Sequence, residues 1–184
     1  MKTKAYALVI AMALAATAML AAAKNPMVGG QEMFPSKNIV ENAVNSADHT
    51  TLVAAVKAAG LVETLESPGP FTVFAPTNEA FAKLPAGAVD NLLRPENQDS
   101  LKKVLTYHVV AGKLSAADLM KKIKEGKGTA ELTTVEGGKL WAMLHEGKHI
   151  MLKDEKGGTA LVMIADVNQS NGVIHVIDSV VMPN

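Results

Sequence analysis

The sequence contains no cysteine, and this absence removes several classes of chemistry at once. Without thiols there is no disulfide framework, zinc–thiolate site, iron–sulfur cluster, thiol nucleophile or lipidated N-terminal cysteine. The chain also lacks an excess of charge of one sign, since 18 basic residues balance 18 acidic residues. This balance argues against binding to nucleic acid, which normally goes with a strong positive excess. A length of 184 residues favours one domain, and a hydrophobic content of 48% is ample for its core.

Residues 1–23 have the pattern of an export signal. Lys2 and Lys4 form a short basic start, no charged residue follows as far as Ala23, and the stretch ends in three alanines. An uncleaved membrane anchor is the alternative, because the uncharged run is just long enough to cross a bilayer. The alanine-rich composition favours cleavage, so we expect a periplasmic or secreted protein. Contact with a membrane would then require that the N-terminal segment stays uncleaved.

The rest of the chain divides into a leader segment at 24–35 and a domain at 36–184. Helical spacing predicts helices near 39–44, 49–59, 78–84, 89–93 and 95–106, with Asn38 or Ser36 capping the first and Asp48 the second. A capping box at 115–118 predicts a further helix. Strands are expected at 71–75 and 107–110, and hairpins follow from Gly128. Helices in the first half and antiparallel strands in the second define an α+β fold.

The last predicted strand, 173–182, carries apolar residues on both of its faces. A strand of this kind is usually covered on both sides. We therefore expect it to be central in the sheet, and we expect Pro183 to prevent further pairing. An Asn171–Gly172 pair precedes it and is suited to a turn with positive φ.

Three segments resemble the conserved boxes of fasciclin-like (FAS1-type) domains, in the family's order. They are 71–81, with Phe74, Pro76, Thr77 and Asn78; 107–110, with Tyr107 and His108; and 171–178, with Asn171, Gly172, His175 and Asp178. The resemblance covers about residues 37–183. It implies a twisted, wedge-like pair of β-sheets with a helical layer along one side. It also implies an extracytoplasmic role in adhesion or protein–protein contact. Because the sequence has no catalytic constellation, we expect a non-catalytic module that mediates cell adhesion or binds a cell-surface or matrix protein or polysaccharide.

The box residues themselves have the character of a folding signature. Thr77 or Asn78 can cap the helix after Pro76. Tyr107, His108 and His175 lie among apolar neighbours, where an aromatic ring with a polar tip usually makes one buried hydrogen bond. In matrix members of the family, an Asp–Ile pair before the last box is proposed to contact integrins, and Asp166–Val167 occupies that place here. The competing interpretation is an aspartate that satisfies a turn.

His145 and His149 are the candidate metal ligands. They flank a short turn, so the two imidazoles should approach each other across a hairpin, with Glu146 as a further donor suited to zinc or copper. Two exposed turn histidines are the simpler interpretation, since spacing fixes no third ligand. The pair nevertheless supports an alternative function as a periplasmic small-ligand or metal-binding protein.

Catalysis has no positive support in the sequence. His175, Asp178 and Ser179 share one strand and cannot converge as a triad, and no nucleophile elbow, P-loop, dinucleotide fingerprint or zinc-protease motif occurs. No cofactor is expected. A run of lysines at 121–127 is typical of a solvated helix end, with weak contact to acidic polysaccharide or lipid as the alternative.

Overall fold

The structure is a computed structural model that describes residues 25–184. The expected signal peptide at 1–23 lies outside the described residues, as does Lys24. The described part begins with a small antiparallel ribbon of β1 (Met27–Val28) and β2 (Gln31–Glu32). Val28 and Met33 are buried in the same cluster as the first helices. The end of the leader segment therefore packs as part of the domain.

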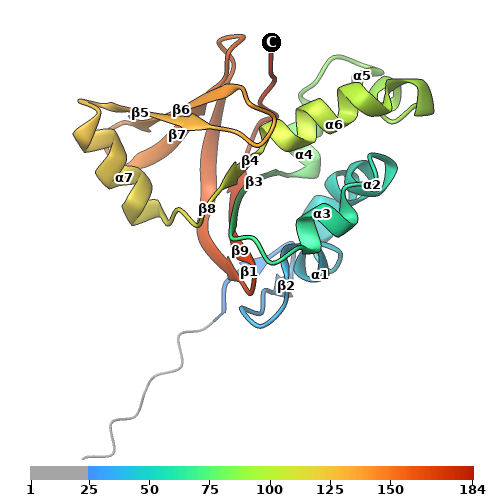
Figure 1. The fold of residues 1–184 in the computed structure, drawn as a ribbon, viewed down its shortest axis with the longest axis horizontal. Helices are drawn as coiled ribbons and strands as arrows, with labels where there is room; N and C mark the ends of the chain where they lie inside the picture. Colours follow the sequence, from blue (N-terminus) through green and yellow to red (C-terminus); the bar gives the residue numbers. More distant parts are fainter. Residues whose placement is uncertain (1–24) are drawn as a thin grey trace, which may run out of the picture.

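Six short α-helices lie on one side of the molecule (Figure 1). They are α1 (Ile39–Ala43), α2 (Thr50–Ala58), α3 (Val62–Glu66), α4 (Asn78–Ala82), α5 (Ala88–Leu92) and α6 (Gln98–Tyr107), with 3₁₀ turns η1 (Ala47–His49) and η2 (Pro95–Asn97). A seventh helix, α7 (Ala116–Glu125), lies on the opposite side. The helical layer that the resemblance implied along one side is present, and α7 adds a helix on the other.

The predicted caps of α1 and α7 are confirmed. Asn38 caps α1 and Ser115 caps α7, each in a reciprocal pair with the acidic residue three positions later. The prediction that Asp48 caps the second helix is wrong. Asp48 lies inside η1, and His49 occupies the N-cap of α2 without a side-chain cap. An extra 3₁₀ turn before a helix moves the cap by one residue, which propensity alone does not reveal.

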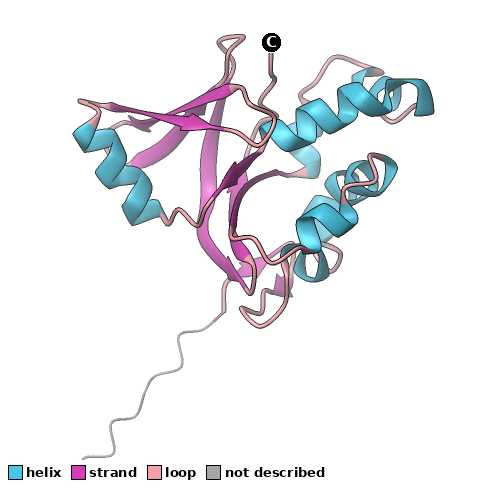
Figure 2. Ribbon diagram, viewed as in Figure 1, coloured by secondary structure: helices cyan, strands magenta, loops and turns pink. Residues whose placement is uncertain are grey.

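Seven strands form one mixed sheet in the order β4-β3-β9-β8-β7-β6-β5. Figure 2 shows the strands in magenta, with helices in cyan on either side. Their bounds are β3 (Phe71–Pro76), β4 (Val109–Ala111), β5 (Thr129–Thr133), β6 (Lys139–His145), β7 (His149–Lys153), β8 (Thr159–Gln169) and β9 (Gly172–Ile177). All neighbours are antiparallel except β3 and β9, which are parallel. The predicted α+β class is confirmed.

The long strand β8 bends and so joins the two parts of the sheet, β4-β3-β9 on one side and β7-β6-β5 on the other. Its pairing with β9 is interrupted twice, between Val162 and Ile164 and between Ile164 and Val167. Bulges of this kind increase twist and turn a strand. The two ends of the sheet, β4 and β5, then approach each other. Val110 in β4 pairs with Thr134, which follows β5, and the Val135 N–H donates to the Val109 carbonyl at 2.7 Å. The sheet therefore curls almost into a closed barrel.

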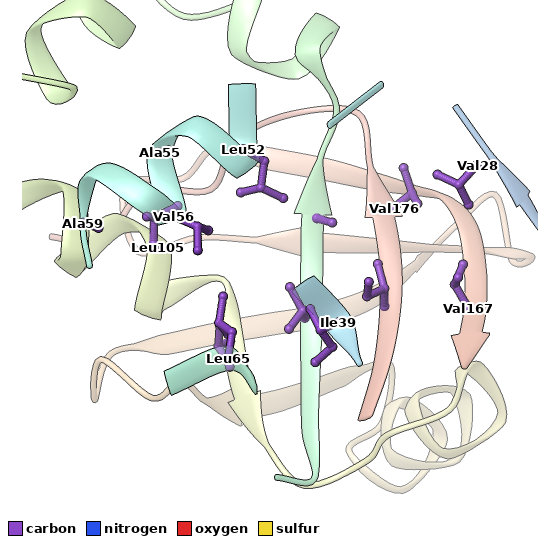
Figure 3. Packing of buried hydrophobic residues seen from close by; sticks show 14 of the residues in the cluster. Val28, Ile39, Leu52, Ala55, Val56, Ala59, Leu65, Leu105, Val167 and Val176 are labelled. Carbon is purple, nitrogen blue, oxygen red and sulfur yellow. The ribbon is translucent and has the colours of Figure 1, made fainter. Parts of the chain in front are cut away.

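Two hydrophobic clusters fill the fold, one on each side of β3 and β9. The first lies under the helical layer and includes Leu52, Leu65, Val73 and Ile174 (Figure 3). The second lies inside the curled sheet against α7 and includes Phe74 and Leu140. All six residues of β9 are buried. This confirms that the last strand is central and covered on both faces.

Two predicted boundaries are wrong. Tyr107 is the last residue of α6 and not the first of a strand, because its helix buries Leu101, Val104 and Leu105 at helical spacing through to Tyr107. The last strand stops at Ile177 and not at residue 182. There the Asp178 N–H donates to the Leu161 carbonyl, and a carboxylate oxygen of Asp178 accepts from the Leu161 N–H. A side chain thus takes the place of the next ladder bond.

Candidate functional site

Asn171 is a buried connector between the last hairpin and the helical layer. Its amide donates to the carbonyls of Leu65 at 2.7 Å and Ser67 at 2.9 Å, and its carbonyl oxygen accepts from the Ile39 N–H at 3.1 Å. These bonds fix the ends of α1 and α3 against β9. Buried polar groups are costly unless paired, so all three partners depend on this one side chain.

Gly172 is needed for a different reason from the one the sequence suggested. Neither Asn171 nor Gly172 has a positive φ, so the predicted positive-φ turn is wrong. A Cβ atom at Gly172 would lie 2.1 Å from the Phe71 carbonyl oxygen. The glycine therefore permits the close approach of β9 to β3.

His175 lies at the centre of the sheet with both ring nitrogens engaged. Nε2 bonds the Leu114 carbonyl at 2.8 Å, Nδ1 accepts from the Asp166 N–H at 3.3 Å, and the ring stacks on Phe74 at 5.6 Å between centroids. Burial lowers the pKa of His175. Asp178 directs its carboxylate toward Lys83 at 3.1 Å. The Ser179 hydroxyl donates to the Asp178 carboxylate at 3.1 Å. All three side chains, of His175, Asp178 and Ser179, therefore make contacts within the fold.

Tyr107 and His108 fasten the end of α6 to two distant segments. The Tyr107 hydroxyl donates to the Lys139 carbonyl at 2.5 Å and accepts from the Glu155 N–H at 3.2 Å, and burial raises its pKa to about 12. His108 bonds the Val104 carbonyl through Nδ1 at 2.8 Å, and its Nε2 accepts from the Val181 N–H at 3.2 Å. Burial lowers the pKa of His108 to about 4.

The first box positions α4. Pro76 is the last residue of β3, and the Thr77 hydroxyl caps α4 by accepting from the Ala80 N–H at 3.2 Å. Asn78 instead ties α4 to α2 and η1, since its amide accepts from the Thr51 N–H at 3.0 Å and donates to the Ala47 carbonyl at 2.9 Å. Of the two predicted caps, Thr77 is therefore the one used.

The Asp166–Val167 pair is split between solvent and core. Asp166 is exposed, has a φ of 59°, and accepts from the Ala116 N–H at the start of α7 at 2.7 Å. Val167 is 1% exposed and belongs to the cluster under the helices. Asp166 alone offers a side chain to a partner, and this side chain already binds the N-terminus of a helix.

His145 and His149 face each other in the register of the β6–β7 hairpin, and both are exposed. His145 Nε2 lies 3.9 Å from a Glu146 carboxylate oxygen. Among residues 25–184, no group of three or more histidine, cysteine or acidic side chains is placed to hold a metal ion. No helix within that range is long and apolar enough to cross a bilayer.

An apolar surface on β6, β7 and β8 was not anticipated from the sequence. Met143, Met151 and Leu161 lie in direct cross-strand register, Trp141 is two residues from Met143, and Met163 continues the row on β8. We call these five residues the outer face. Met163 is 61% exposed, whereas the alternate residues point into the core. Alternation of methionine and leucine with buried residues was the signal that could have found it.

The fold and the arrangement of these boxes define a small α+β domain. The sequence pattern of the Fasciclin domain matches residues 47–183. The chain belongs to the Fasciclin domain family.

Relatives and a solved structure agree with this assignment. "Protein sll1483" of Synechocystis sp. is 48% identical over 160 residues, which cover 87% of this chain and 81% of that protein. "Cell surface glycolipoprotein MPB83" of Mycobacterium bovis is 32% identical over 168 residues, which cover 88% of this chain and 68% of that protein. A FAS1 domain pair from the insect cell adhesion molecule Fasciclin I matches with a TM-score of 0.57 at 25% identity, covering 71% of this chain and 43% of that one.

Proposed function

We propose that the protein is an exported, non-catalytic binding module that contacts a cell-surface or matrix protein or polysaccharide through its outer face. Membership of the Fasciclin domain family supports a binding role, as does likeness to proteins named for the cell surface and for cell adhesion. The observation that carries the proposal is the row Met143, Met151 and Leu161 on the solvent side of three adjacent strands.

The composition of the outer face fits a recognition surface. Tryptophan and methionine are enriched in interfaces and adapt to different partners. Charged residues surround them, because Lys139 on β6 and Lys153 on β7 are exposed, as is Glu131, which pairs with Trp141 from the adjacent strand β5. An apolar centre with a polar rim is the usual anatomy of a protein contact.

Binding of the purified protein to the cells that produce it tests this proposal. Met151→Asp and Met163→Asp place a charge on the outer face, and we expect each to weaken saturable binding about tenfold or more. Val44→Asp is the matched control, because Val44 is 48% exposed but lies at the end of α1, outside the outer face. Equal binding by all four proteins would remove the outer face as the contact surface.

Export is tested separately, by mass spectrometry of the protein recovered from cell fractions. We expect a chain that begins at Lys24 in the periplasmic or extracellular fraction, since three alanines precede this residue. Recovery of an intact Met1 in the membrane fraction would instead support an anchored protein.

A further inference from the structure

The hairpin of β6 and β7 brings two histidines and two methionines together on one face of the sheet. His145 pairs with His149 in the strand register, and Met143 pairs with Met151. Residues two apart along a strand lie on the same side of the sheet, so the two pairs are neighbours. We call these four residues the donor square. The two strands lie side by side, away from the helices α1 to α6 (Figure 1).

A tight turn holds the histidine pair in place. Glu146 and Gly147, at the tip of the hairpin, have φ angles of 52° and 72°. The Lys148 N–H donates to the His145 carbonyl at 3.2 Å. Two consecutive residues with positive φ match the twist of the flanking strands. The turn therefore fixes the register of the hairpin, and with it the position of each imidazole opposite the other.

The dimensions of the donor square suit a single metal ion. Residues directly opposite each other in an antiparallel pair have Cβ atoms about 5 Å apart, and residues two apart along a strand are about 7 Å apart. A point above the centre of the square is then roughly 4–5 Å from each Cβ atom. Imidazole nitrogen and sulfur donors reach such a point with a coordination bond of about 2.0–2.3 Å. The three rotatable bonds of methionine let its sulfur adjust.

The chemistry of the donors selects the ion. Thioether sulfur is a soft ligand that favours copper(I), and imidazole also suits copper. The four donors carry no negative charge and the two methionines are half-buried, so a monovalent ion costs less desolvation than a divalent one. A Glu146 carboxylate oxygen lies 3.9 Å from His145 Nε2. It offsets part of the positive charge but is too distant for a hydrogen bond that would occupy the ring.

We propose that the donor square binds one copper(I) ion through both imidazoles and both thioethers. Spacing in the sequence offered only the two histidines, and the strand register supplies the two methionines. These methionines also belong to the outer face. The inference does not rest on the contact function proposed for that face, because metal binding is tested on the purified protein alone.

Anaerobic titration of the full chain with Cu⁺, in competition with the coloured chelator bathocuproine disulfonate, tests the proposal. We expect the protein to remove one Cu⁺ per chain from the chelator. The ε-methyl NMR signals of Met143 and Met151 should shift on binding. The single tryptophan, Trp141, lies two residues from Met143 on the same face, and we expect its fluorescence to change with the same stoichiometry.

Removal of the donors should weaken this binding. The double variant Met143→Leu/Met151→Leu loses both sulfurs but keeps the apolar volume. We expect its affinity for Cu⁺ to fall about 100-fold or more, since even outer-shell partners of a metal are worth about 10- to 100-fold. His145→Gln/His149→Gln should have an effect of the same order. Met120→Leu is the matched control, because Met120 is 36% exposed but lies on α7, and it should bind Cu⁺ as the wild type does.

Three results would overturn the proposal. The first is a wild type that takes no Cu⁺ from the chelator. The second is a methionine double variant with wild-type affinity. The third is displacement of bound Cu⁺ by Zn²⁺ in about tenfold excess, since a site that uses thioethers favours the softer ion. Leucine preserves the apolar surface, so the methionine double variant should still bind to the producing cells. Loss of copper with retained cell binding therefore separates the metal site from the contact function.

Discussion

At the scale of single residues, the boxes that identify the family are mainly points of attachment between elements. Asn171 ties α1 and α3 to the last hairpin, Tyr107 reaches β6, and His108 holds the C-terminal segment at Val181. Each of these side chains hydrogen-bonds to a backbone group that has no partner within a regular helix or strand. Their presence in the sequence therefore reports on how the fold is closed, and substitutions there should be read first as changes in stability.

Gly172 provides the clearest test of such a position. We expect Gly172→Ala to lower the free energy of unfolding by about 3 kcal/mol or more, because its Cβ would overlap the Phe71 backbone and force β9 away from β3. Gly30→Ala is the control. Gly30 has a φ of 73° but open space around it, so its cost should stay near the ~1 kcal/mol of a left-handed alanine. Urea denaturation measures both, and equal losses would contradict the steric argument.

His108 should make stability depend on pH. Its pKa is about 4 in the folded protein and about 6.5 when unfolded, so the unfolded chain binds the proton more tightly. Stability from this group is complete above pH 6.5 and is lost as the pH falls toward 4, by about 3 kcal/mol in total. Protonation also removes the acceptor for the Val181 N–H.

Urea denaturation at pH 7 and pH 4.5 checks this prediction. His108→Gln retains polar groups but does not titrate, and we expect it to be less stable at pH 7 with a smaller loss on acidification. A wild-type loss that His108→Gln reproduces in full would assign the pH dependence to other groups.

At the scale of elements, α7 is attached to the sheet through Asp166 as well as through its buried side. Asp166 accepts from the Ala116 N–H while its own backbone is left-handed. We expect Asp166→Ala to cost about 1–2 kcal/mol, since it removes the acceptor and disfavours this conformation. Asp166→Asn retains both features and should change stability by less than about 0.5 kcal/mol.

The same pair of variants separates a structural role from a partner role for Asp166. Thermal or urea unfolding gives the stability of each, and the cell-binding measurement gives its affinity. If Asp166→Asn is as stable as the wild type but binds more weakly, the carboxylate contacts a partner. Unchanged binding would leave Asp166 as a residue of the α7 attachment.

The sequence predicted the elements better than their junctions. Periodicity and capping boxes located α1, α2 and α7, and the doubly apolar pattern of β9 indicated its central place. The parallel pairing of β3 and β9, the bend in β8 and the 3₁₀ turn before α2 were missed, because they depend on contacts between distant residues. An apolar cavity under the helical layer was missed for the same reason, since its walls include residues of α1, α2, α3, α6, β3, β4, β8 and β9.

At the scale of the whole molecule, the two hydrophobic clusters share β3 and β9 and should therefore melt together. Val73 and Ala75 face the helical cluster, whereas Phe74 between them faces the cluster inside the curled sheet. A strand whose two faces belong to different cores cannot leave one without leaving the other. The bridge between Val110 and Thr134 adds a second link. These contacts predict a single cooperative transition, as small domains usually show.

Leu52→Ala and Leu140→Ala test this coupling, one in each cluster. Leu52 is 8% exposed and Leu140 is 0% exposed, and we expect each change to cost about 2–4 kcal/mol. Far-UV circular dichroism reports mainly on the helices, and Trp141 fluorescence reports on the curled sheet. In each variant, both signals should shift to the same lower urea midpoint. In the double variant, the free energy of unfolding should fall by the sum of the two single losses, within about 0.5 kcal/mol. If Leu140→Ala moved the fluorescence midpoint and left the helical signal unchanged, the two cores would be separate folding units, and the central strands would not couple them.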